Sequence, residues 1–132
     1  MEKQHKNLEL IQSFFIAYNQ KDMEALGNIL DSEITWNIPG EHPLSGLKKG
    51  VEEVLDYFKE MEYYQFQAAN LVLGVNESFV VDCHQNWTDF NGKRFEVMSC
   101  LLWKIQGGKI KEVHNFPGDQ KAVNDFFITN GR

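Results

Sequence analysis

The sequence predicts an α+β fold, with helices packed on one face of a curved antiparallel sheet. Apolar residues recur at helical spacing in the first half of the chain, while the part from about Tyr64 onward alternates in the manner of strands. Helices followed by a run of strands are typical of α+β proteins. A length of 132 residues with 42% hydrophobic content fits one domain, expected over residues 1–132.

Three helices are predicted before the main run of strands. They cover residues 7–19, a short segment that Asp22 would cap, and a segment from about Lys48. A strand over residues 34–38 lies between the second and third helices, because apolar and polar residues alternate there, and it ends at Pro39-Gly40. Three helices on a curved sheet would leave a wedge-shaped hollow.

The second half reads as a meander of strands followed by one helix. Turn signals separate the strands at Asn76-Glu77, Asn91-Gly92 and Gly107-Gly108. Asp119 would cap the last helix. Aromatic residues make up 13% of the chain, enough to line a pocket as well as to fill a core.

The charge balance excludes several classes of partner. Lys and Arg total 13 and Asp and Glu total 19, so the formal net charge is −6. An acidic chain without basic clusters lacks the electrostatic features of a nucleic-acid or anionic-membrane binder. The N-terminal stretch has no long apolar run, so we expect no signal peptide, no spanning helix and a cytoplasmic location.

The sequence carries no motif for a metal or a cofactor. Zinc-ligand, phosphate-loop and nucleophile-elbow patterns are missing, and the four histidines have no ligand-like spacing. We therefore expect no metal site and no cofactor. Two cysteines are too few for a disulfide scaffold, and both are expected to be reduced.

The order of the elements resembles the NTF2-like superfamily, in particular its SnoaL-like and ketosteroid-isomerase-like branch. The resemblance rests on residues 19–22 after the first helix, Pro39-Gly40 and Ser45-Gly46 in the loop after the first strand, Gly92-Lys93, and residues 108–116. It covers nearly the whole chain. It implies a cone-shaped fold with a pocket at one end, often dimeric, that serves isomerases, cyclases, hydrolases, dehydratases and proteins without known chemistry. Function therefore has to be argued from the site.

The catalytic positions of the ketosteroid isomerases hold apolar residues in this chain. Counting along the resemblance places Ile38 where those enzymes have their Asp base, Phe14 at the tyrosine position and Leu101 at the second Asp position. An apolar side chain cannot accept a proton, so the steroid isomerase mechanism is not expected. Asn115 stands where the epoxide hydrolases of this fold have an Asp, and an amide orients a ligand but is a poor base.

The length of the turn at Asn91-Gly92 decides which side chains face the pocket, because a shift of one residue turns a strand over. With a two-residue turn Cys83 faces Cys100, and Asp82 and His84 point into the pocket as an acid–base pair. With a three-residue turn Asp82 and His84 lie outside, and an apolar set faces inward instead. That inward set is Phe79, Val81, Cys83, Trp87, Phe95, Val97, Leu101 and Trp103.

We favour the three-residue turn because it gives a sheet with one apolar and one wet face. A three-residue turn at Gly107-Gly108 would pair Leu101 with Val113 and Ser99 with Asn115, which makes Asn115 the leading polar residue of the pocket.

The function predicted from these observations is binding of a small apolar or cyclic molecule in an aromatic-lined pocket. The alternatives are an isomerase, cyclase or dehydratase with a His/Asp acid–base pair, and a non-catalytic protein-interaction module. The candidate catalytic residues are His84, Asp82 and His42, and the candidate ligand-binding residues are Tyr18, Trp36, Phe58, Phe95, Ser99, Leu101, Trp103 and Asn115. A homodimer through the outer face of the sheet is expected, since Met98, Cys100 and Leu102 would otherwise be exposed.

Overall fold

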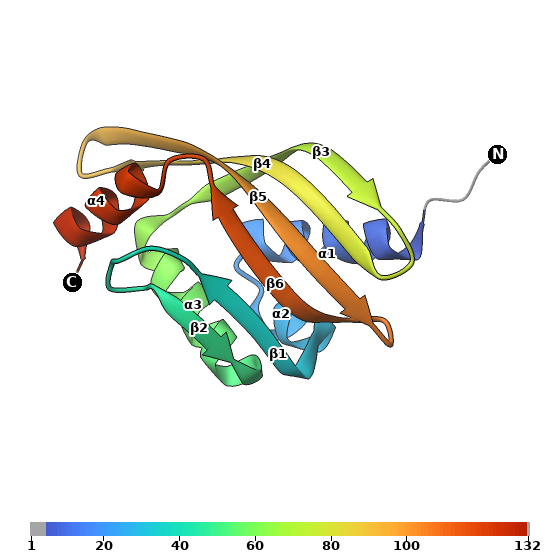
Figure 1. Cartoon of the computed structure of the whole chain (residues 1–132). Coiled ribbons are helices and arrows are strands. Elements are labelled where there is room, and N and C mark those ends of the chain that lie inside the picture. Colours follow the sequence, from blue (N-terminus) through green and yellow to red (C-terminus); the bar gives the residue numbers. More distant parts are fainter. Residues whose placement is uncertain (1–4, 132) are drawn as a thin grey trace.

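The computed structural model describes residues 5–131 and contains helices and strands in the predicted order. The helices are α1 (Lys6–Asn19), α2 (Met23–Ile29), α3 (Gly50–Tyr64) and α4 (Gln120–Asn130). The strands are β1 (Leu30–Ile38), β2 (Gly46–Lys49), β3 (Gln67–Val75), β4 (Phe79–Phe90), β5 (Lys93–Gln106) and β6 (Lys109–Pro117). Figure 1 shows one curved sheet with α1, α2 and α3 on the same side and α4 at one end.

The sheet is mixed, in the order β2-β1-β6-β5-β4-β3. The predicted α+β class and curved sheet are confirmed. The prediction that the sheet is antiparallel is wrong for one pair, because β1 runs parallel to β6. β1 precedes α3 in the chain, and on one side it pairs with β6, the last strand. The short strand β2, which pairs antiparallel with β1, was not predicted.

Local sequence signals explain the helix starts. The Asp22 side chain accepts a hydrogen bond from the backbone N–H of Ala25, and the Asp119 side chain accepts one from the backbone N–H of Ala122, so both predicted N-caps are confirmed.

The main core lies between the helices and the sheet, where Ile11, Leu26 and Trp103 are fully buried. Among the described residues no helix is long and apolar enough to cross a membrane.

The β4–β5 hairpin differs from the favoured prediction. Phe90 pairs with Lys93, so the turn has two residues, and Asn91 and Gly92 have φ angles of 52° and 77°. Positive φ at both central positions is the geometry for which Asn-Gly is preferred in a type I′ turn. The predicted three-residue turn is therefore wrong. In consequence Asp82 and His84 point inward.

The opposite face of β4 carries the residues that were predicted to point inward. Val81 is 48% exposed, Cys83 pairs with Cys100, and Trp87 lies beneath the guanidinium of Arg94 at 5.9 Å. On β5 the predicted inward set is correct, since Val97, Leu101 and Trp103 are buried. The register error thus turned over one strand of the hairpin only.

The β5–β6 pairing also differs from its prediction. Leu101 pairs with Asn115 and Ser99 with Pro117, and the turn at Gly107-Gly108 again has two residues. An irregularity between Lys104 and Ile105 adds a further shift in the ladder. The observed pairing is two residues away from the predicted one. Asn115 therefore keeps the predicted face of the sheet.

Candidate functional site

An aromatic-walled cavity lies between the inner face of the sheet and the helices. The volume of this cavity is about 100 Å³. A single water needs roughly 10–15 Å³ of such space, so the cavity has room for a small organic molecule. Its walls come from α1, β1, the loop after β1, α3, β3 to β6 and α4, and they include Phe14, Trp36, Ile38, Phe58, Phe66, Phe95, Leu101 and Phe127.

A buried acid–histidine pair supports one wall of this cavity. The Asp82 side chain is 0% exposed and lies behind the wall, while His84 is 4% exposed and lines the cavity. His84 Nδ1 lies 2.5 Å from Asp82 Oδ1. The second carboxylate oxygen accepts a hydrogen bond from the indole N–H of Trp103, and Asn70 Nδ2 donates to Oδ1 over 3.4 Å. The carboxylate is therefore fixed on both oxygens.

These contacts determine what His84 offers to a ligand. Asp82 accepts the indole N–H, and an ionised carboxylate has no hydrogen to donate, so Nδ1 of His84 is the donor within the pair. In a neutral imidazole the other nitrogen, Nε2, then carries a lone pair. The ring also packs edge-on against Phe15, with centroids 5.6 Å apart, which helps to fix its orientation. This arrangement suits proton transfer at Nε2.

Two tyrosines contribute phenol groups from the helical wall. Tyr18 on α1 and Tyr57 on α3 both line the cavity. Burial raises the pKa of Tyr18 to about 12. Burial, reinforced by the neighbouring Tyr18, raises the pKa of Tyr57 well above its usual range. Both phenols are therefore protonated at neutral pH and can donate hydrogen bonds to an oxygen of a ligand.

Two further polar atoms in the cavity wall are buried without a hydrogen-bond partner among residues 5–131. They are Nε2 of His42 and Oδ1 of Asn115. His42 Nδ1 accepts the N–H of Leu44 over 3.2 Å, and its ring stacks on Phe127 with centroids 4.8 Å apart. Burial, more than the nearby Lys48, lowers the pKa of His42. Neutral His42 thus carries its hydrogen on Nε2, and a bound molecule could satisfy this donor and the Asn115 acceptor.

The predicted site residues occupy two layers. Tyr18, Trp36, Phe58, Phe95, Ser99, Leu101 and Asn115 line the cavity together with His42 and His84. Trp103 does not; it is fully buried behind the wall, where it contacts Asp82. Phe14, Ile38 and Leu101, which occupy the positions of the isomerase catalytic groups, all line the cavity. No metal-type cluster of three or more His, Cys, Asp or Glu side chains occurs within the described part of the chain.

Sequence reasoning missed several wall residues. Tyr57 follows the buried Val54 by three positions and precedes Met61 by four, so helical spacing alone could have found it. Asn86 lies two positions beyond His84 on β4 and donates to Ser99 Oγ over 3.3 Å. Gln120 comes from α4 and carries no local signal that it faces a cavity.

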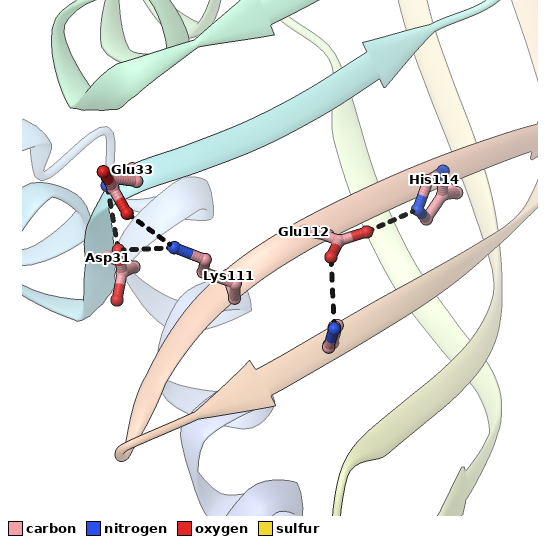
Figure 2. A network of polar contacts seen from close by, with 6 residues as sticks. Asp31, Glu33, Lys111, Glu112 and His114 are labelled. Carbon is pink, nitrogen blue, oxygen red and sulfur yellow. Dashed lines mark hydrogen bonds and ion pairs between the residues drawn. The ribbon is translucent and has the colours of Figure 1, made fainter.

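His114 provides a contrast to His84. Figure 2 shows it on β6 beside Glu112, whose Oε1 lies 3.3 Å from Nε2 of the histidine. The same figure shows Lys111 between Asp31 and Glu33, at 3.4 and 3.2 Å. The His114 side chain is 43% exposed, and this network does not reach the cavity. Ion pairs at this exposure contribute little to stability.

Comparison with known proteins identifies the family. The family model for the SnoaL-like domain matches residues 11–113, so the chain belongs to the SnoaL-like family. An uncharacterized protein of Mycobacterium tuberculosis is 22% identical over 125 residues, which cover 92% of this chain and 95% of that protein. Family membership explains the resemblance in sequence. The function still has to be argued from the residues of the site.

Solved structures share the fold over almost the full length. Bal32a, from a soil-derived mobile gene cassette, is similar with a TM-score of 0.87 and 25% identity, covering 92% of this chain and 96% of Bal32a. A putative SnoaL-like polyketide cyclase from Jannaschia sp. CCS1 has a TM-score of 0.77 and 14% identity, with all of both chains covered. At 14% identity the likeness concerns the fold alone.

Proposed function

We propose that this protein is an enzyme that moves a proton on a small, largely apolar cyclic molecule, with His84 as the general acid–base. The observation that carries the proposal is the inward orientation of His84, with Nδ1 held by Asp82 and Nε2 left for a ligand in the cavity. Asp82 is a positioning residue, because it lies behind the wall and fixes the tautomer of the imidazole. The class of reaction is isomerisation, cyclisation or dehydration.

The other walls support such a substrate. The aromatic rings exclude water and favour an apolar ring system. Tyr18 and Tyr57 offer protonated phenols from the helical side, opposite the sheet that carries His84. An oxygen bound between these phenols would gain negative charge as a proton leaves the neighbouring carbon, and hydrogen-bond donors stabilise such charge. His42 and Asn115 supply one further donor and one further acceptor.

Proton transfer can be tested without knowing the natural substrate. The protein is incubated with a panel of small cyclic ketones in D₂O, and deuterium uptake beside the carbonyl is followed by NMR. We expect uptake above the buffer rate, and a loss of about 100-fold or more in His84→Gln, since a positioned acid–base group contributes 10²–10⁴-fold. His114→Gln is the matched control, because that histidine lies outside the cavity.

A second candidate function is binding without turnover. It is favoured by the two unpaired buried atoms, which a ligand would satisfy whether or not it reacts. Binding alone would broaden the NMR signals of the ketones in the wild type and not in a Phe95→Ala variant, while deuterium uptake stays at the buffer rate. That result would contradict the enzyme. Uptake that is equal in wild type and His84→Gln would exclude His84 as the acid–base group.

We also propose that the protein associates with itself through the outer face of the sheet. This outer face is the surface opposite the cavity, and it consists of Val81, Cys83, Met98, Cys100, Leu102 and Phe116. Met98 is 49% exposed and Phe116 is 59% exposed. Several apolar side chains on one exposed sheet face favour a partner, and a second copy of the chain supplies the same surface. A cytoplasmic location remains the prediction from the sequence.

A further inference from the structure

Both cysteines of the chain lie on the outer face and directly opposite one another. Cys83 on β4 pairs with Cys100 on β5, and both thiols are free and half-buried. Side chains of directly opposed residues point to the same side of a sheet. The Cys83 thiol raises the pKa of Cys100 by acting on it as a hydrogen-bonding neighbour, so the two sulfur atoms lie close together.

The position of this pair in the ladder suits a covalent bond. Phe90 and Lys93 close the two-residue turn and form a hydrogen-bonded pair, and hydrogen-bonded and non-hydrogen-bonded pairs alternate from there. Cys83 and Cys100 are the seventh residue pair beyond Phe90 and Lys93, so they are a non-hydrogen-bonded pair. Such pairs have Cα atoms about 4.5 Å apart. That separation is within the range of roughly 4.4–6.8 Å found for disulfides.

We propose that Cys83 and Cys100 are a redox pair that closes an intramolecular cross-strand disulfide when a small-molecule disulfide oxidises the protein. The Cys83 thiolate attacks the small disulfide, which forms a mixed disulfide and releases one small thiolate. The Cys100 thiolate then attacks the sulfur of Cys83 and releases the second. Two protein thiols lose two electrons and two protons in total, and the small disulfide is reduced to two thiols.

The bond would form beside the candidate site. Cys83 lies between Asp82 and His84 along β4, with its side chain on the opposite face of the sheet. Cys100 lies between Ser99 and Leu101 on β5, where Leu101 pairs with Asp82 and Ser99 pairs with His84. A covalent link at this step would hold β4 and β5 in the one register that points Asp82 and His84 into the cavity. The link joins neighbours within one chain, so it needs no second copy.

Oxidation by glutathione disulfide tests the pair. The protein is studied at a concentration where size-exclusion chromatography shows monomer, and intact mass and free thiols are measured under non-reducing conditions. We expect the wild type to lose both thiols and the mass of two hydrogen atoms. Cys83→Ser and Cys100→Ser should instead gain one glutathione each, because the second thiol is missing. The Tm of the oxidised wild type should rise by roughly 5–10 °C.

Three results would overturn the proposal. One is a wild type that keeps two free thiols under conditions that add glutathione to the single variants. Another is a wild type that forms cross-linked dimers rather than an internal bond. A Tm that is unchanged after the internal bond has formed would overturn the inference that the bond holds the register. None of these readouts depends on catalysis, so they stand apart from the test of His84.

Discussion

The two faces of the β4–β5 hairpin each carry residues that depart from the usual distribution of polar and apolar side chains. The inner face buries Asp82 and His84, while the outer face exposes Val81 and Met98. In an ordinary antiparallel sheet the apolar side chains face the core and the polar ones face water. Buried polar groups cost free energy unless they are paired, and exposed apolar groups favour a partner. These departures underlie the two proposals, proton transfer at the inner face and self-association through the outer face.

The largest effect is expected when the buried carboxylate of Asp82 is removed. Asp82→Ala leaves Nδ1 of His84 and the indole N–H of Trp103 without their acceptor in the core. Breaking a buried pair in this way costs about 3–5 kcal/mol, so we expect a loss of roughly 3 kcal/mol in the free energy of unfolding measured with urea.

Asp89→Ala is the matched control on the same strand. That carboxylate pairs with Arg94 over 3.1 Å and is 72% exposed, so its loss should cost under about 1 kcal/mol. Equal losses from the two variants would show that the Asp82–His84 pair is not buried as described.

Alkaline pH probes the phenols of the inner side. The pKa of Tyr18 is about 12 in the folded protein, against a value near 10 in an unfolded chain. Because the folded pKa is raised, this contribution to stability is complete below pH 10 and is lost as the pH rises toward 12. We expect the free energy of unfolding to fall by roughly 2 kcal/mol over that interval. Tyr18→Phe should make the fall smaller, and an unchanged fall would contradict a buried phenol.

The turn that sets the two faces can be strained without touching either face. Gly92 has φ of 77°, and a Cβ added there would meet no atom within 4 Å. Gly92→Ala should therefore destabilise by about 1 kcal/mol through the backbone alone. Gly27→Ala in α2 is the control of opposite sign, because a Cβ there makes an ordinary contact of 3.5 Å with Leu55 and alanine favours helix. Urea unfolding measures both, and a stabilising Gly92→Ala would contradict the two-residue turn.

The smallest effect on folding is expected on the outer face. Met98 is 49% exposed, so Met98→Ser should change the free energy of unfolding of the monomer by less than about 0.5 kcal/mol. The same variant should weaken self-association, which sedimentation equilibrium measures. An association constant equal to that of the wild type would place the partner surface elsewhere.

The fold was predictable because its signals are local and repeated. Helical spacing, the Asp22 and Asp119 caps and the turn residues each specify a nearby element, and they agree with one another. The short strand β2 was missed because three of its four residues, Gly46, Lys48 and Lys49, have low strand propensity. The parallel pairing of β1 with β6 depends on contacts between distant parts of the chain, which no local pattern encodes.

The orientation of the site was predicted wrongly because two local signals disagreed. The choice at Asn91-Gly92 rested on the assumption that the apolar face of β4 is the inner one. On this strand Val81, Cys83 and Trp87 form the outer face, and the assumption therefore selected the wrong turn. The Asn-Gly dipeptide itself favours a two-residue turn, and giving it more weight would have placed His84 in the cavity.

The attachment of α4 has a practical consequence for how such a protein can diversify. Phe126 and Phe127 of this helix pack in a cluster with Tyr64 and Phe66. Two side chains also join it to the loop after β1: Gln120 donates to the carbonyl of Pro39 over 3.4 Å, and Asn124 accepts from the N–H of Glu41 over 3.1 Å. The eleven residues of α4 supply part of the cavity wall and none of the Asp82–His84 pair. Exchanging α4 between relatives would thus change part of the cavity wall and leave the Asp82–His84 pair unchanged.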